Sequence, residues 1–155
     1  MVSTWTVGDV APTYGCAPCI LFTMTDSQAR KEQSRTRITK LVFPHDTNPI
    51  GTLYGGTAMH WMDEAAFLTA TRYSRRQVVT VSMDRVDFKV PIPEGSIVEL
   101  VGEVIRTGRS SMTVRVCILL EDTMAGTQEL AIEGSLVMVA VDERMKPVAL
   151  SDHQE

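Results

Sequence analysis

The feature of this sequence that most restricts its fold is one helix-like segment followed by four strand-like segments. After its first residue, the segment 56–73 contains no glycine and no proline, and it is rich in alanine, methionine and leucine. Residues 78–90, 96–108, 111–122 and 128–143 are rich in β-branched residues and partly alternate between apolar and polar side chains. Proline or glycine marks each break, with Pro91, Pro93 and Gly95 before the second segment, Gly108 at its end and Gly126 before the fourth. This order predicts an α+β domain with one antiparallel sheet around a single long helix.

The predicted helix has one small, apolar face. Its alanine, methionine and threonine side chains recur three and four residues apart, which places them on one side of a helix. A face of this kind allows the helix to lie close to the sheet. Residues 37–43 are expected to form a first strand, and residues 44–55 a loop with two prolines and two glycines. The face consists of Ala58, Met62, Ala65, Ala66, Thr69 and Ala70.

Length and composition favour one globular domain that does not bind nucleic acid. The 155 residues are enough for one core, and 44% of them are hydrophobic. The net charge is −4 and there is no long basic run, which argues against a nucleic-acid partner. This net charge is still compatible with a small anionic ligand bound by a few arginines or lysines. No apolar run approaches the length of a membrane span, so no membrane partner is expected.

The cysteines favour a reducing compartment. The chain has three, an odd number, which fits reduced thiols in the cytoplasm better than a set of disulfides. Cys16 and Cys19 have the CxxC spacing, but no second pair accompanies them, so a metal or redox role is not favoured. Residues 15–24 lack the preceding basic region of a signal peptide.

The domain is expected to span residues 37–146, between two tails. Residues 1–36 show little periodicity and become polar and charged after Met24, which predicts a solvated, disordered N-terminal tail. The change of character also fits a natural start at Met24, with the preceding residues as an extension. Residues 147–155 are expected to form a C-terminal tail.

Asp63 is the strongest single candidate for a functional residue. It lies about two turns after Gly56, so it shares a face with the Gly55–Gly56 pair. This is roughly the face of Met59 and Ala66, which is expected to point inward. A carboxylate there is costly unless it is paired or used in chemistry. Two interpretations stay open: a catalytic carboxylate, or one that binds a backbone group or is exposed by rotation of the helix.

Gly55 and Gly56 open the helix, where a ligand could approach the backbone closely. The first N–H groups of a helix lack partners within it, and the helix dipole favours negative charge there. An oxyanion forming on an acyl carbonyl would be stabilised at such a place. The alternative is a tight turn that needs a positive φ. Asn48 could orient a water or a carbonyl, or it could be an ordinary turn residue.

A second candidate lies in the turn between two predicted strands. Arg109, Ser110 and Ser111 follow Gly108 and offer a cation and two hydroxyls, which suit a phosphate group. The alternative is a plain hairpin turn. The sequence alone leaves both open.

The remaining ionisable residues near the helix carry weaker signals. Glu64 lies about 100° around the helix from Asp63 and is expected to be solvated or paired with Arg37 or Arg72. His45 and His60 are candidate bases by residue type, but His60 lacks a serine or cysteine partner at a suitable position. They are expected to be packed or partly exposed rather than catalytic bases.

The ordered set of motifs resembles the hotdog-fold acyl-CoA thioesterases, in particular the YciA-like and brain acyl-CoA hydrolase type. Each motif is weak alone, but together they extend in register over residues 37–142. They are Pro44, DTN at 46–48, Gly51, YGG at 54–56, MDEA at 62–65, VVTV at 78–81, DF at 87–88, PI at 91–92, Gly95 and TGRSS at 107–111.

The resemblance implies a hotdog fold, with about five antiparallel strands wrapped around one long central helix. It implies that Asp63 is the catalytic carboxylate, that Asn48 assists it, and that the backbone at Gly55 and Gly56 polarises a thioester carbonyl. Tyr54 would border the substrate, where relatives carry a small or aromatic residue, which leaves the acyl preference open.

The resemblance also implies an acyl-CoA substrate and a dimer or trimer of dimers. Coenzyme A would enter as part of the substrate, and no metal or other cofactor is expected. Arg109, Ser110 and Ser111 would hold the CoA phosphates. Two alternatives stay open: a non-catalytic acyl-CoA-binding or sensing protein, and a hotdog dehydratase or hydratase, which would need a histidine with an acidic partner.

Helix geometry independently favours a site shared between subunits. Gly56 and Asp63 are separated by about 10 Å along one helix at 1.5 Å per residue. A reacting carbon must lie about 3 Å from both its nucleophile and its oxyanion donors. One helix can hardly serve one thioester with both groups. In a two-fold dimer with antiparallel helices, Gly56 and Asn48 of one subunit could meet Asp63 of the other.

Overall fold

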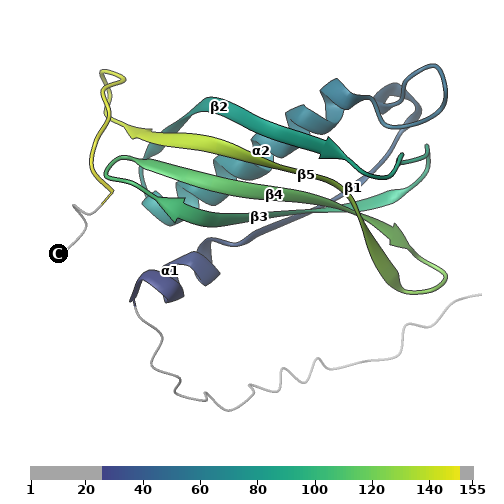
Figure 1. Ribbon diagram of the computed structural model, residues 1–155, viewed down its shortest axis with the longest axis horizontal. Coiled ribbons are helices and arrows are strands. Elements are labelled where there is room, and N and C mark those ends of the chain that lie inside the picture. The colour runs from purple at the N-terminus through teal and green to yellow at the C-terminus, as the bar shows by residue number, and fades with distance from the viewer. Residues whose placement is uncertain (1–25, 151–155) are drawn as a thin grey trace, which may run out of the picture.

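The structure, a computed structural model, describes residues 26–150. They form two α-helices, one short 3₁₀ helix and five strands (Figure 1). In chain order these are α1 (Asp26–Ser34), β1 (Thr36–Leu41), η1 (Pro44–Asp46), α2 (Gly55–Ser74), β2 (Gln77–Phe88), β3 (Ile97–Thr107), β4 (Ser111–Asp122) and β5 (Thr127–Val141).

The five strands form one antiparallel sheet around α2. Their order across the sheet is β1-β3-β4-β5-β2, and every neighbouring pair is antiparallel. The long helix α2 crosses one face of this sheet (Figure 1). The predicted α+β architecture is therefore confirmed, and the predicted strands and helix occur in the predicted order.

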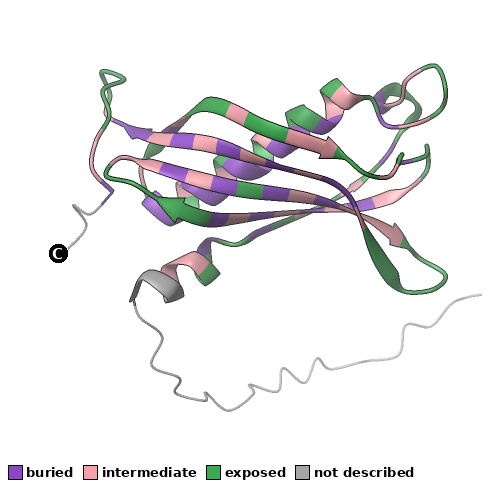
Figure 2. Ribbon diagram, viewed as in Figure 1, coloured by how far each residue is buried: buried purple, intermediate pink, exposed green. Residues whose placement is uncertain are grey.

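The core lies between α2 and the sheet. The six small or apolar side chains predicted on the inner face of the helix are all 0% exposed. Facing them, Val98, Leu100 and Val104 of β3 are buried, and intermediate or exposed residues alternate with them (Figure 2). The alternation follows from the pleat of a strand, which points successive side chains to opposite faces.

Two glycines allow α2 to approach the sheet. A Cβ added to Gly102 on β3 would collide with the Thr69 hydroxyl and lie 3.2 Å from the Ala65 carbonyl oxygen. A Cβ added to Gly134 on β5 would lie 2.9 Å from Met62 Cε. Small residues on the helix and glycines in the sheet thus account for the close packing of the two layers.

Replacing Gly102 with alanine is expected to lower the free energy of unfolding by about 1–3 kcal/mol, because the added methyl overpacks this contact. Urea unfolding followed by circular dichroism measures the change. Gly56→Ala is the matched control, since its added Cβ would lie 3.5 Å from Tyr54 Cδ1, an ordinary contact. Equal stability of the two variants would contradict this account of the packing.

Residues 26–34 were expected in a disordered tail, but they form helix α1, which contacts α2 and β3. Ser34 and Thr36 are each 1% exposed, and Arg72 Nη1 donates a hydrogen bond of 3.0 Å to Thr36 Oγ1. The residues of α1 are mostly polar because one side of this helix faces solvent. Residues 1–25 of the expected tail, with the CxxC pair and Met24, lie outside the described residues.

The expected C-terminal tail also begins as ordered structure. Residues 147–150 fold back on the sheet, where the Val148 N–H donates to the Ala140 carbonyl at 2.9 Å. Leu150 is only 8% exposed. Three apolar side chains at Val148, Ala149 and Leu150 gave too short a pattern to predict this packing.

Candidate functional site

Asn48 organises the loop between β1 and α2. Its Oδ1 accepts hydrogen bonds from the backbone N–H groups of Ile50 at 3.0 Å and Thr52 at 3.2 Å. Its Nδ2 donates to Thr52 Oγ1 at 2.9 Å. Because two backbone donors occupy the oxygen, the orientation of the amide is determined, and its NH₂ group is the part available to a ligand. Asn48 is thus a turn residue that can also act as a hydrogen-bond donor.

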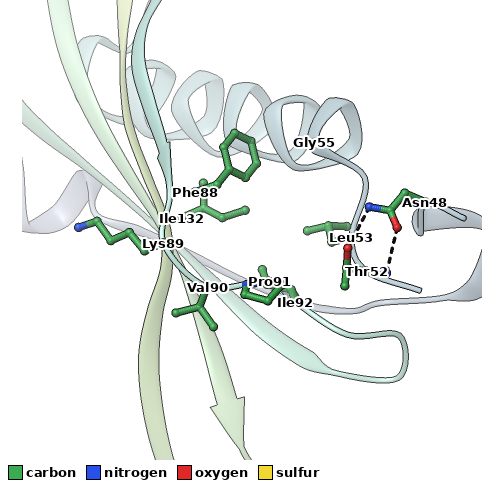
Figure 3. A pocket seen from close by; sticks show the side chains of 10 residues that line it. All are labelled: Asn48, Thr52, Leu53, Gly55, Phe88, Lys89, Val90, Pro91, Ile92 and Ile132. Atoms are coloured by element: carbon green, nitrogen blue, oxygen red, sulfur yellow. Dashed lines mark hydrogen bonds between the residues drawn. The ribbon is translucent and has the colours of Figure 1, made fainter. Parts of the chain in front are cut away.

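A cavity of about 470 Å³ brings Asn48 together with the first turn of α2. Figure 3 shows Asn48 on one side of it, Gly55 above and Phe88 opposite, with Lys89 at the strand end. Most of the wall is apolar, which suits the uncharged part of a ligand. The lining residues are Asn48, Thr52, Leu53, Gly55, Phe88, Lys89, Val90, Pro91, Ile92 and Ile132.

Gly55 and Gly56 are the first two residues of α2, and neither has a positive φ. The alternative of a tight turn that needs glycine is therefore wrong. A Cβ at Gly55 would lie 3.5 Å from Phe88 Cζ, and one at Gly56 would lie 3.5 Å from Tyr54 Cδ1. Neither contact forbids a side chain. The helix also lacks a side-chain cap at Tyr54, so its first N–H groups are available as hydrogen-bond donors.

Asp63 lies on the third turn of α2 beside strand β2. Thr80 of β2 donates a hydrogen bond of 2.7 Å from Oγ1 to Asp63 Oδ1. This holds one carboxylate oxygen and leaves Oδ2 available to a ligand. The residue is half-buried, and Met59 on the same side is 40% exposed. The expectation that this face points into the core holds for Ala66, which is 0% exposed, and is wrong for Met59, so Asp63 lies at the boundary of the core beside the edge strand β2.

The residues around Asp63 differ in part from expectation. Glu64 is exposed and pairs with Lys40 at 2.8 Å, whereas Arg37 pairs with Glu99 at 2.8 Å. The predicted partner Arg72 instead donates to a threonine. Lys40 was missed because strand β1 comes beside the helix only in the folded chain.

The two described histidines lie outside the cavity. His60 is exposed, and His45 stacks on Phe43 with ring centroids 5.5 Å apart. Neither lines the cavity that contains Asn48 and Gly55. This matches the expectation that they are exposed or packed side chains.

Arg109, Ser110 and Ser111 lie at the β3–β4 turn. This turn is at the opposite end of the sheet from the start of α2 (Figure 1). Arg109 is exposed, and the two serines are partly exposed. A single chain therefore does not bring this turn together with Asn48 and Gly55.

Thr80 is the functional candidate that the sequence did not reveal. It lies in the VVTV motif, where its type and spacing indicate only a strand. Thr80 is 17 residues from Asp63 in the sequence, and the two come together because β2 packs beside α2. A threonine at the edge of a sheet carries no local signal of such a role.

Other reactive groups lie outside the cavity. Cys117 is half-buried on β4, and burial, followed by the nearby Glu133, raises the pKa of its thiol. Within residues 26–150 there is no group of three or more histidine, cysteine, aspartate or glutamate side chains that could hold a metal ion. No helix in this range is long and apolar enough to cross a membrane.

Comparison with known proteins identifies the class to which this fold and site belong. The family model of the thioesterase superfamily matches residues 50–127, about half of the chain. The chain belongs to the thioesterase superfamily, and its fold is the hotdog fold. It is accordingly a thioester hydrolase, as its relatives are named.

Several relatives cover most of the chain. An uncharacterized acyl-CoA thioester hydrolase of Bacillus subtilis, YkhA, is 44% identical over 117 residues, which is 76% of this chain and 68% of that one. An acyl-CoA hydrolase from Staphylococcus aureus, solved with butyryl coenzyme A, coenzyme A and coenzyme A disulfide, is 40% identical with a TM-score of 0.75 over 77% of this chain and 73% of that one. A hexameric thioesterase from Yersinia pestis is 31% identical with a TM-score of 0.67 over 72% and 91% of the two chains.

The Staphylococcus aureus hydrolase has also been solved as alanine variants. One asparagine, one aspartate and one threonine were replaced, at positions that follow one another at intervals of 15 and 17 residues. Asn48, Asp63 and Thr80 follow one another at the same two intervals in this chain.

Proposed function

We propose that the protein hydrolyses acyl-CoA to a free acid and CoA, with Asp63 as the catalytic carboxylate. The observation that carries the proposal is that one oxygen of Asp63 is held by Thr80 at 2.7 Å, while the other remains available for chemistry. The Staphylococcus aureus hydrolase, which was solved with butyryl coenzyme A, supports the substrate class. Its three altered positions support the choice of residues through their spacing.

The start of α2 and Asn48 would bind the thioester carbonyl. The N–H groups of Gly55 and Gly56 lie where the helix dipole favours negative charge. The NH₂ group of Asn48 borders the same cavity as Gly55. These donors would stabilise the oxyanion that forms when the carbonyl carbon is attacked. Tyr54, which is 56% exposed beside Gly56, would border the acyl group.

Asp63 would start the reaction through Oδ2. Either it removes a proton from a water that attacks the carbonyl carbon, or it attacks directly and forms a mixed anhydride that water then hydrolyses. In both routes the C–S bond breaks and CoA leaves as a thiolate. Because a thiol is far more acidic than an alcohol, this leaving group needs little help from an acid. We propose no metal or other cofactor.

The site would be shared between two subunits. Strand β2 lies at one edge of the sheet, and its Val81 is 62% exposed. A long unpaired edge favours pairing with another strand. Thr80 lies on this edge strand and contacts Asp63, so a second copy paired there would bring its own α2 next to them. Antiparallel helices would then place Asn48 and Gly56 of one subunit near Asp63 of the other.

The assembly would be a dimer or a trimer of dimers. Hexamers are known for a thioesterase from Yersinia pestis and for an acyl-CoA thioesterase that is 45% identical. Arg109, Ser110 and Ser111 would bind the CoA phosphates. Within one chain this turn lies far from the start of α2 (Figure 1), but the β3–β4 turn of a second subunit could lie near the start of α2 of the first. We place the protein in the cytoplasm, with neither nucleic acid nor membrane as a partner.

Thiol release from a panel of acyl-CoAs tests the proposal. The panel would extend from acetyl to palmitoyl and include aromatic acyl groups, and the pattern of turnover would identify the preferred acyl group. Turnover of at least one member is expected. No turnover of any member, with CoA still bound, would refute the proposed hydrolysis and favour a sensing role.

Thr80→Val is expected to lower kcat roughly 10- to 100-fold, because a hydrogen bond to a charged group contributes about 1.5–3 kcal/mol. Valine keeps the shape of the side chain but cannot donate to Asp63. Steady-state assays with one acyl-CoA measure the effect. Thr39→Val is the control, since Thr39 is an exposed threonine on β1, at the other edge of the sheet. An unchanged kcat for Thr80→Val would contradict this role.

A further inference from the structure

The end of the described chain forms a tight reversal after β5. We name residues 142–150 the C-terminal return. Asp142 Oδ1 accepts hydrogen bonds from the N–H groups of Arg144 and Lys146, each at 2.9 Å. The Asp142 N–H donates to the Lys146 carbonyl at 2.9 Å, and Met145 takes a φ of 61°. Asp142 therefore holds the reversal together.

Beyond the reversal, the return runs along β5 and reaches the β3–β4 turn. Pro147 forms a bridge with Val141, and the Val148 N–H donates to the Ala140 carbonyl at 2.9 Å. The Leu150 N–H then donates to the Arg109 carbonyl at 2.9 Å. Leu150 is 8% exposed, so its side chain anchors the end of the return in the core.

These contacts hold the backbone of the turn that contains Arg109, Ser110 and Ser111. The Ala140 N–H donates to the Ser110 carbonyl at 2.9 Å, while the return holds the Arg109 carbonyl. The described peptide bonds are trans, so the Ser110 N–H points opposite to the Arg109 carbonyl and away from the Leu150 N–H. The Ser110 N–H, the Arg109 guanidinium group and the two serine hydroxyls thus belong to one turn, whose backbone is fixed by hydrogen bonds. Such turns can bind anions.

We propose that the C-terminal return positions the CoA-phosphate site, with Asp142 and Leu150 as positioning residues. The inference rests on the proposed function, which assigns the phosphates to this turn. A held turn binds a phosphate more tightly than a mobile one, because less conformational entropy is lost on binding. The return would therefore affect the affinity for CoA but leave the chemistry at Asp63 unchanged.

A purely stabilising role of the return makes a different prediction. If Leu150 only covered the core, loosening the return would affect every substrate alike. An N-acetylcysteamine thioester with the same acyl group discriminates between the two roles. It keeps the reacting carbonyl and sulfur but lacks the CoA phosphates.

Asp142→Ala is expected to raise KM for butyryl-CoA about tenfold and to leave KM for butyryl-N-acetylcysteamine and both kcat values unchanged. Leu150→Ala, which removes the anchoring side chain, is expected to act in the same direction. Glu143→Ala is the matched control, since Glu143 is an exposed residue of the same reversal. Circular dichroism and urea unfolding establish that each variant is folded.

Calorimetric titration with free CoA provides a second readout that does not depend on turnover. Asp142→Ala or Leu150→Ala is expected to weaken CoA binding by a factor similar to the rise in KM. If both folded variants bind CoA as wild type does, or if KM rises equally for both thioesters, the inference is overturned. A wild type that binds CoA but hydrolyses no member of the acyl-CoA panel would refute the proposed function, and the titration would still decide the role of the return.

Discussion

Replacing Asp63 with asparagine is expected to lower kcat for acyl-CoA hydrolysis by a factor of about 10²–10⁴, the usual contribution of a general base. The amide has the shape of the carboxylate, and its oxygen can still accept the Thr80 hydrogen bond seen at 2.7 Å. It cannot take a proton from water or attack a carbonyl carbon. The affinity for CoA and the free energy of unfolding should therefore remain close to those of wild type. Thiol release, CoA titration and urea unfolding measure the three quantities.

Glu64→Gln is the matched control for this experiment. Glu64 is the next residue of the same helix, but it is exposed and pairs with Lys40 at 2.8 Å on the surface. An exposed ion pair contributes little to stability, so this variant should keep both its fold and its turnover. An Asp63→Asn enzyme that retains wild-type kcat would show that another group performs the attack.

Two inactive variants are expected to restore activity when they share an assembly. Asp63→Asn removes the carboxylate from one side of the proposed site. Asn48→Asp removes the NH₂ donor from the other side, yet its oxygens can still accept the N–H groups of Ile50 and Thr52 that shape the loop. A mixed dimer contains one site with both changes and one with neither. Up to about half of the wild-type turnover should therefore return, if one intact site works independently of the other.

Co-expression with two different affinity tags allows the mixed assembly to be purified through both. The control is Asp63→Asn co-expressed with itself under the same two tags, which should stay inactive. If the mixed assembly is no more active than its parents, Asn48 and Asp63 serve the thioester from the same subunit. An active monomer would lead to the same conclusion.

The elements of this fold could be predicted because their signals are local. The spacing of Ala58, Met62 and Ala65 reflects the turn of an α-helix, and the alternation through Val98 and Leu100 reflects the pleat of a strand. The same patterns failed for α1 and for residues 147–150. Short segments that pack through one or two side chains leave almost no periodic signal.

The residues of the candidate site could be predicted from motifs, and helix geometry predicted that they meet across two subunits. The motifs pointed to Asn48, Gly55 and Asp63, and the structure places the first two at one cavity and the third on a later turn of the same helix. Their joint action in one reaction remains a prediction. It depends on how a second subunit packs against the first, which no local pattern of residues describes.

The sequence by itself determined the order of helix and strands, the buried face of α2 and the candidate carboxylate, because each depends on neighbouring residues. Tertiary structure alone decided that Thr80 holds Asp63, that Lys40 rather than an arginine pairs with Glu64, and that Leu150 reaches the turn at Arg109. Each of these contacts joins segments that are distant along the chain. Their geometry follows from how the helix and the sheet pack, and packing depends on all the side chains of the core at once.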